Sequence, residues 1–372
     1  EDIPIVMITK SEEEKIMEEA IGSKIADYLI KPLNPNQILL SVKKILDNRR
    51  LITEKTNQGY QQDFRNIAMQ YNDRIGHEEW AEILKKITYW ELELDKTNDK
   101  SMAEVLEMQK AEANSNFTRF IQDTYEDWMS DPKSDKPILS HHLMKKKVFP
   151  LLKPNEPLFF LLIDNLRYDQ WKSMQEIITE FFTIEQQETY YSILPTATSY
   201  ARNAIFSGLT PAEMARQHPD IWVNDEGENE ESLNNHEAEF LKRQIDKNRL
   251  QTKFSYHKII STQQGKSLLD NFSNLLRNDL VVVVYNFVDM LSHAKTEMEV
   301  VKELASNDKA YRSLTLSWFK NSPLLEMIQQ AQQMGFRLII TTDHGTINVK
   351  NPSKVIGDKN TSLNLRYKTG RS

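Results

Sequence analysis

The sequence predicts an α/β fold class, because strand-like apolar runs alternate with segments of helical periodicity. Three of the strand-like runs are Leu158–Asp164 (LFFLLID), Leu280–Tyr285 (LVVVVY) and Arg337–Thr342 (RLIITT). Apolar runs of this length are typical of strands that are covered on both faces of a parallel sheet. Because ligands bind beyond the carboxyl ends of such strands, we expect a functional site where these three runs end.

Composition narrows the class of protein. The chain of 372 residues is long enough for two or three domains, and its 39% hydrophobic content is enough to bury their cores. The formal charge of −7 disfavours a general nucleic-acid-binding surface. Cysteine is absent, which excludes disulfides and thiol catalysis and fits a reducing compartment. No apolar run approaches the roughly 20 residues that span a bilayer, so we expect a cytoplasmic protein without membrane insertion.

The N-terminal stretch of residues 1–48 predicts a small α/β unit. Two strand-like runs, Ile5–Ile8 and Ala26–Ile30, lie on either side of a helix predicted from the capping box of Ser11 and Glu14. Asn34 precedes a proline and marks the start of a second helix.

The order of these elements resembles the second half of a response-regulator receiver domain. The resemblance depends on Thr9 after the first strand, Tyr28 within the second and Lys31 directly after it. In that family the threonine and the lysine contact a phosphoryl group on an aspartate, and the aromatic residue changes rotamer on activation. The resemblance therefore implies that residues 1–48 form the C-terminal half of a receiver with Thr9, Tyr28 and Lys31 as its switch. It also implies that the phosphoacceptor aspartate lies outside this chain.

Residues 49–149 predict a helical linker bundle, because apolar residues recur there at helical spacing. The first two sets are Phe64, Ile67, Ala68 and Tyr71, and Trp80, Ile83, Leu84, Ile87 and Trp90; the third is Val105, Leu106, Met108, Phe117, Phe120, Ile121 and Trp128. Ser101 and Glu104 form a capping box for the third helix. The apolar stripes predict a core, and the alternative is a partner groove or dimer face. We expect His141 and His142 at the surface, since neighbours on one element do not face the same way.

A candidate nucleophile follows the first buried run. Pro195–Thr198 (PTAT) opens a helix, and the start of a helix offers free N–H groups that suit a phosphate. Thr198 is the predicted nucleophile, with activation by a metal ion, and Arg202 one turn later could reach a phosphate oxygen. Alone, Thr198 could merely cap its helix.

Two further acidic positions have a histidine close by. Asp289 follows the run Leu280–Tyr285, with His293 four residues later, and Asp343 and His344 follow the run that ends at Thr342. Three carboxylates at strand ends, two of them near a histidine, predict a metal site at one edge of the sheet. The alternatives are that Asp164 is a turn residue at the end of its strand and that His344 is a hydrogen-bonded histidine before a turn glycine.

The sequence order of these motifs resembles the alkaline phosphatase superfamily, whose members use two metal ions, usually zinc, and a serine or threonine nucleophile. The resemblance covers residues 150–372 and implies an alkaline-phosphatase-like α/β/α sandwich. By position, it implies that one metal is held by Asp164, Thr198, Asp343 and His344, and that Asp289 and His293 hold the other. No histidine follows His344, so we expect the second set, and this domain, to be incomplete at the C-terminus. Carboxylate and imidazole ligands favour Zn²⁺ or Mn²⁺ over Mg²⁺.

The combination of a partial receiver, a helical linker and this sandwich resembles PglZ-domain response regulators. The resemblance implies a two-component regulator with a metal-dependent phosphoesterase output, most simply a phosphodiesterase, that controls type IX secretion. Expected partners are a sensor histidine kinase, a sigma factor or the cytoplasmic part of a secretion motor, and a second copy of the chain. The alternatives are a catalytically silent scaffold and a phosphoryl-transfer enzyme of the mutase type.

Overall fold

The computed structural model describes residues 4–10, 25–71, 75–97, 99–131, 133–223 and 234–349, together with positions 351, 353, 354, 356, 367 and 368 of the C-terminal tail. The chain forms two compact units, Glu1–Ser130 and Asp131–Ser372, and each is described by itself. The helix predicted from Ser11 lies outside the described residues. Among the described helices, none combines the length and the apolar character that a membrane crossing requires.

In the first unit, strands β1 (Ile5–Thr9) and β2 (Ile25–Ile30) pair in parallel. The backbone N–H of Lys31 donates to the carbonyl O of Thr9 at 2.7 Å. Thr9 and Lys31 therefore lie at the carboxyl ends of neighbouring strands, as the receiver resemblance requires. The roles of Thr9, Tyr28 and Lys31 in a switch stay predictions.

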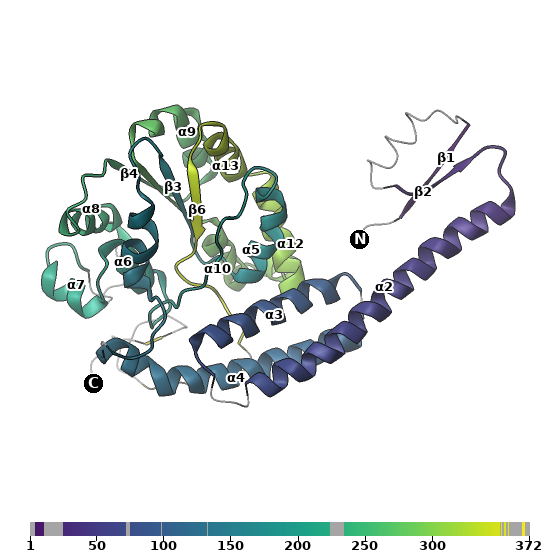
Figure 1. The fold of residues 1–372 in the computed structure, drawn as a ribbon, viewed down its shortest axis with the longest axis horizontal. Helices are drawn as coiled ribbons and strands as arrows, with labels where there is room; N and C mark the ends of the chain where they lie inside the picture. The colour runs from purple at the N-terminus through teal and green to yellow at the C-terminus, as the bar shows by residue number, and fades with distance from the viewer. Residues whose placement is uncertain are drawn as a thin grey trace. The chain divides into compact units, whose positions relative to one another are not determined.

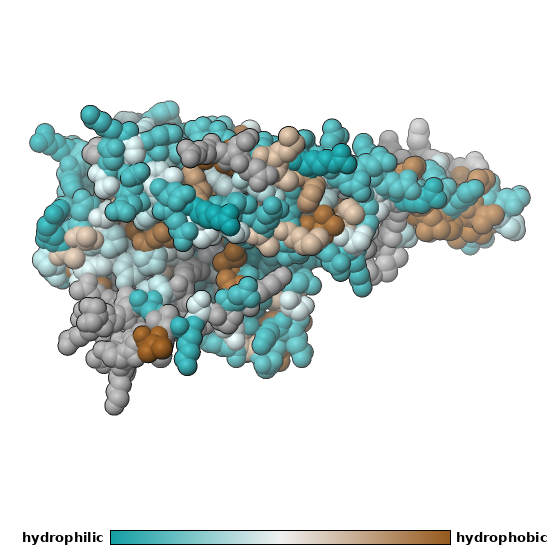
Figure 2. Space-filling view, turned by 90° about the horizontal axis from the view of Figure 1, so that it is seen from below, coloured by the Kyte–Doolittle hydropathy of each residue, from teal (hydrophilic) through white to brown (hydrophobic). Residues whose placement is uncertain are grey.

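Helix α2 (Pro35–Gln70) begins where the sequence predicts, because the Asn34 side chain accepts a hydrogen bond from the Asn36 N–H and Pro35 occupies the first turn. The helix then runs through residue 48 without interruption. The predicted boundary between the receiver half and the linker therefore falls inside one helix. The first part of α2 is apolar yet exposed, with Leu39 66% and Leu46 60% accessible. Figure 2 shows hydrophobic side chains gathered over this end of the unit, and such surface is typical of a contact site.

Helices α3 (His77–Asp95) and α4 (Lys100–Ser130) complete the predicted bundle with the second half of α2 (Figure 1). Its buried core consists of Tyr60, Ile67, Tyr71, Trp80, Ile83, Ile87, Trp90, Leu94, Leu106 and Ala113. A Cβ atom at Gly59 would lie 2.9 Å from the Trp90 ring, so this glycine allows the indole to pack against α2. Two details differ from the sequence prediction. Leu84 and Met108 are exposed, and the Asp99 side chain caps α4 in place of Ser101.

The second unit is built around a parallel sheet of the order β4-β5-β3-β6. The strands are β3 (Leu158–Ile163), β4 (Phe254–Ile259), β5 (Leu280–Tyr285) and β6 (Arg337–Thr341). The helices are α5 (Tyr168–Ile178), α6 (Thr198–Ser207), α7 (Pro211–Gln217), α8 (Glu237–Lys247), α9 (Thr262–Asp270), α10 (Phe287–Glu297), α11 (Glu299–Leu304), α12 (Asp308–Lys320) and α13 (Pro323–Gln333). Shorter helical turns are η1 (Ser140–His142), η2 (Met144–Val148), η3 (Phe149–Leu151) and η5 (Phe272–Arg277).

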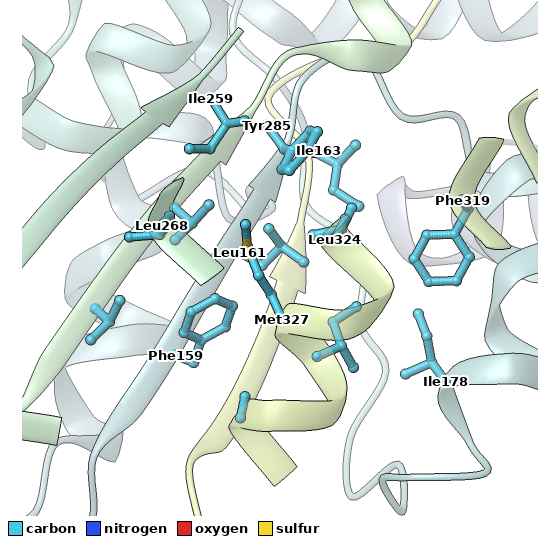
Figure 3. Close-up of a cluster of buried hydrophobic side chains, with 14 of the residues drawn as sticks. Phe159, Leu161, Ile163, Ile178, Ile259, Leu268, Tyr285, Phe319, Leu324 and Met327 are labelled. Atoms are coloured by element: carbon cyan, nitrogen blue, oxygen red, sulfur yellow. The ribbon is translucent and has the colours of Figure 1, made fainter. Parts of the chain in front are cut away.

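Helices cover both faces of this sheet, so the predicted α/β/α sandwich is confirmed (Figure 1). Alternate residues of β3 point to opposite faces. Phe159, Leu161 and Ile163 pack in one core with α5, α9, α12 and α13, as Figure 3 shows. On the other face Phe160 contacts Phe206 of α6. All six residues of β3 and of β5 are buried, which explains why both read as continuous apolar runs.

Residues 140–151 pack with the second unit, although the sequence placed the start of the domain at residue 150. Leu139 forms a β-bridge with Tyr191, and the Ile193 N–H donates to Ser140 Oγ at 3.0 Å. The division between the units lies instead at Ser130 and Asp131.

His141 and His142 are half-buried rather than surface residues. Both lie in the turn η1, where their ring centroids are 4.0 Å apart. Burial, together with the neighbouring His142, lowers the pKa of His141 from 6.5 to about 4. Its Nδ1 is buried without a hydrogen-bond partner in the described residues.

Acid should therefore remove the contribution of neutral His141 to the stability of the second unit. The unfolded chain binds a proton at His141 near pH 6.5, whereas the folded chain resists it down to about pH 4. Stability is thus full above pH 6.5 and falls as the pH drops, by about 2 kcal/mol between pH 7 and pH 5. Urea unfolding of the chain and of His141→Phe at both pH values measures this loss. Equal losses in the two proteins would contradict the assignment to His141.

Candidate metal centre

The parallel register brings two predicted metal ligands to one edge of the sheet. Strand β3 lies between β5 and β6, and Asp164 follows it directly, while Asp343 comes two residues after β6. The Asp164 N–H donates to the Tyr285 carbonyl O at 2.9 Å, which continues the ladder to the site. Asp164 and Asp343 are both fully buried. Neighbouring parallel strands therefore deliver both carboxylates to the same place.

A third carboxylate comes from the helix that follows β5. Helix α10 starts immediately after this strand, with Asn286 as its N-cap, and Asp289 lies in its first turn. Asp164, Asp289 and His344 each present one ligand atom, and these atoms lie within 4.8 Å of one another. The cluster combines residues from the two ligand sets that the sequence suggested, so Asp289 of the second set lies beside the first set.

The predicted nucleophile lies against this cluster. Thr198 Oγ1 is 2.9 Å from His344 Nε2 and 3.4 Å from Asp164 Oδ1. Thr198 opens helix α6, whose N-cap is Ala197. The sequence led us to expect free N–H groups at Ser199 and Tyr200, but the Tyr200 N–H donates to the Ala197 carbonyl O at 3.1 Å. The Ser199 N–H has no acceptor among the described residues, so it is the group open to an anion.

The backbone carbonyl of the next residue, Gly345, orients the His344 ring. Its Nδ1 lies 3.3 Å from the Gly345 carbonyl O, which can only accept, so Nδ1 carries the proton of this hydrogen bond. The lone pair of Nε2 then faces the cluster, 3.7 Å from Asp164 Oδ1 and 3.8 Å from Asp343 Oδ2. This tautomer suits a metal ligand.

The donor set fits a divalent cation. Asp343 Oδ1 accepts hydrogen bonds from the N–H groups of Asn165 and His344, but Asp343 Oδ2 is buried with no hydrogen-bond partner in the described part of the chain. A buried carboxylate oxygen without a partner is costly unless a cation neutralises it. Carboxylates with an imidazole are ligands of Zn²⁺ and Mn²⁺.

The electrostatics of the centre show the same need for positive charge. Burial, and then the charge of Asp343, raise the pKa of Asp164 well above its usual value. Burial also raises the pKa of Asp289, but the hydrogen bond and charge of His293, with His344 and the hydrogen bond from Asn165, together make its net shift downward. His293 itself lies at the rim, with 59% of its side chain exposed and Nε2 3.5 Å from Asp289 Oδ2.

Arg202 is placed differently from the sequence expectation of a phosphate contact. Its side chain is 1% exposed, and Nη1 donates to Asp164 Oδ2 at 2.6 Å while Nε donates to Glu237 Oε1. The Tyr256 hydroxyl donates to the other oxygen of Glu237. Arg202 therefore neutralises part of the negative charge of Asp164 through an ion pair with its Oδ2. In this arrangement, two of its donors are already used.

Sequence reasoning missed the residues that support the centre. Glu237 and Tyr256 hold Arg202, and the Tyr190 hydroxyl donates to the Thr342 carbonyl O. Asn165 adopts φ 63°, in the left-handed region, next to Asp164. The sequence held one signal for this turn: asparagine follows the strand-end Asp164, and asparagine tolerates the left-handed conformation better than most residues.

Comparisons with known proteins identify the families of two parts of the chain. A family model described as the BREX system PglZ alkaline phosphatase-like domain matches residues 143–372. A second model, the PorX response regulator linker domain, matches residues 50–129, which correspond to most of the helical bundle. A comparison with curated proteins gave no match.

Arg202→Leu should destabilise the second unit strongly, because it leaves Asp164 and Glu237 buried without their common partner. The expected loss is about 3–5 kcal/mol in metal-free buffer, measured by urea unfolding. Arg243→Leu is the matched control, since Arg243 also pairs with two carboxylates, Asp220 and Glu239, but at the surface. Its removal should cost about 1 kcal/mol or less. Equal losses of stability in the two variants would show that the buried ion pairs of Arg202 contribute no more to stability than the surface pairs of Arg243.

Proposed function

Because the chain belongs to the family of PglZ alkaline phosphatase-like domains, we propose that it is a metal-dependent phosphoesterase with Thr198 as its nucleophile. The observation that carries this proposal is the position of the Thr198 hydroxyl, 2.9 Å from His344 Nε2 at the edge of a cluster of buried carboxylates. The family match supports a phosphoesterase-like output in general terms. The nucleophile, the metal requirement and the substrate type are our inference.

In the proposed reaction, Thr198 Oγ1 attacks the phosphorus of a phosphodiester. The hydroxyl proton passes to water, a bond forms between Oγ1 and phosphorus, the bond to the leaving oxygen breaks, and that oxygen takes a proton from water. A second water molecule later cleaves the phospho-threonine ester and restores the hydroxyl. Asp164 Oδ1, at 3.4 Å, orients the hydroxyl, since the lone pair of His344 Nε2 would be taken up by the metal. The Ser199 N–H and the positive end of α6 bind a non-bridging oxygen of the phosphate.

Asp164, Asp289, Asp343 and His344 would hold the metal, with His293 beside Asp289 at the rim. When bound, a divalent cation supplies the positive charge that favours the ionised hydroxyl and the charge developing on phosphate. We propose Zn²⁺, in two ions, with Mn²⁺ as the second choice on the chemistry of the donors. The burial of Asp164 and Asp343 excludes water from this side of the centre.

We also propose that the activity belongs to a response regulator. The linker match supports this proposal, as do the paired strands β1 and β2, with Thr9 at the end of β1 and Lys31 directly after β2. Its input would be phosphorylation by a sensor histidine kinase, with Thr9, Tyr28 and Lys31 as the switch. Its output would control type IX secretion through a sigma factor or the cytoplasmic part of a secretion motor, with the regulator acting as a homodimer.

Thr198→Val should abolish turnover while metal binding weakens only modestly, because valine keeps the shape of threonine and removes the hydroxyl. We expect a loss of at least about 10³-fold in the hydrolysis of an aryl phosphodiester at saturating Zn²⁺, with bound zinc counted in each protein. Thr196→Val is the matched control in the same turn and should retain most activity.

Other outcomes would change the assignment. Normal turnover by Thr198→Val with loss in Thr196→Val would move the nucleophile to Thr196. If the unsubstituted chain binds zinc but does not hydrolyse the diester, and neither substitution changes this, the scaffold alternative replaces the enzyme.

A further inference from the structure

Asn165 connects the two acidic groups that flank the centre. Its backbone N–H donates to Asp343 Oδ1 at 3.2 Å, and its side-chain Nδ2 donates to Asp289 Oδ1 at 3.0 Å. Asp343 follows β6, whereas Asp289 lies in α10, which follows β5. A single residue therefore holds two carboxylates that come from opposite sides of β3.

The two hydrogen bonds decide which carboxylate oxygens remain for a cation. Asn165 occupies Oδ1 of both aspartates. Asp343 Oδ2 is then left buried without a hydrogen-bond partner in the described residues, and Asp289 Oδ2 faces His293 at 3.5 Å. Fixing one oxygen of a carboxylate orients the other, which is how neighbouring groups tune a metal ligand.

The backbone of Asn165 makes this double contact possible. Its φ of 63° turns the chain sharply after β3, so that the N–H points to the Asp343 side and the side chain to the Asp289 side. The residue is 2% exposed, and its Oδ1 lacks a hydrogen-bond partner among the described residues. A buried amide with an unused oxygen is costly, so packing alone does not account for asparagine at this position.

We propose that Asn165 is a positioning residue that fixes Asp289 relative to Asp343 and thereby sets the affinity of the Asp289 side of the centre for a divalent cation. The inference rests on the metal requirement of the proposed function. It assigns Asn165 no contact with the reacting atoms. Its action goes through Asp289.

Asn165→Gly isolates the side-chain contact, because glycine adopts the same φ and keeps the N–H that donates to Asp343. We expect the weaker of two Zn²⁺ sites to lose about 10- to 100-fold in affinity, with the tighter site unchanged, in an equilibrium titration of the intact chain. Asn155→Gly is the matched control. Asn155 has φ 62°, but it lies in the turn before β3, at the opposite end of the strand from Asp164. It should bind zinc as the unsubstituted chain does.

A double-substitution cycle tests whether Asn165 acts through Asp289. In an Asp289→Asn background, Asn165→Gly should cause no further loss of zinc affinity, whereas a general structural effect would add to it. This comparison holds even if Asn165→Gly lowers the overall stability.

Each remaining result has one meaning. Equal zinc affinities of the unsubstituted chain and Asn165→Gly would overturn the inference while leaving the proposed function intact. Additive losses in the cycle would do the same. Failure of the unsubstituted chain to bind Zn²⁺ or Mn²⁺ would instead overturn the proposed function, and the inference with it.

Discussion

Repulsion among buried carboxylates is the constraint on which the second unit depends. Asp164 and Asp343 are fully buried, and the charges of Asp343 and Asp289 add to the burial that makes ionisation of Asp164 harder. The protein supplies only part of the balancing charge, through Arg202 behind Asp164. The hydrogen bonds to Asp343 come from backbone N–H groups, which stabilise a negative charge without cancelling it. The donor atoms of such a site fit a divalent cation, as the proposed function requires.

The fold and the position of the centre could be predicted because they follow from local patterns. Continuous apolar runs identified β3 and β5 as strands buried on both faces, and strand ends in a parallel sheet meet at one edge. The polar residues after those runs therefore had to come together, whichever helices lay between them. Asn34 and Pro35 located the start of α2 for an equally local reason.

The remaining features depend on contacts between distant residues, which one sequence does not reveal. Arg202 lies one turn from Thr198, which suggested a phosphate contact, but Glu237 and Asp164 hold its donors elsewhere. Nothing near Glu237 in the sequence indicates that pairing. The continuity of α2 past residue 48 was missed because helical periodicity persists across a domain boundary as readily as within a domain. The sequence prediction chose Ser101 as the cap of α4, but Asp99, two residues earlier, is also a good capping residue and is the one that caps the helix.

The centre joins parts of the chain that lie far apart, and this has a consequence for how the unit folds. Asn165 and Asp343, which share a hydrogen bond, are separated by 178 positions. Closing so long a loop has an entropic cost that must be met before the contact forms, so such pairings come late and slowly. Until β6 has docked beside β3, Asp343 and His344 are absent from the cluster. If the proposed function holds, metal capture cannot nucleate this fold, and a bound ion would mark a chain whose sheet is already assembled.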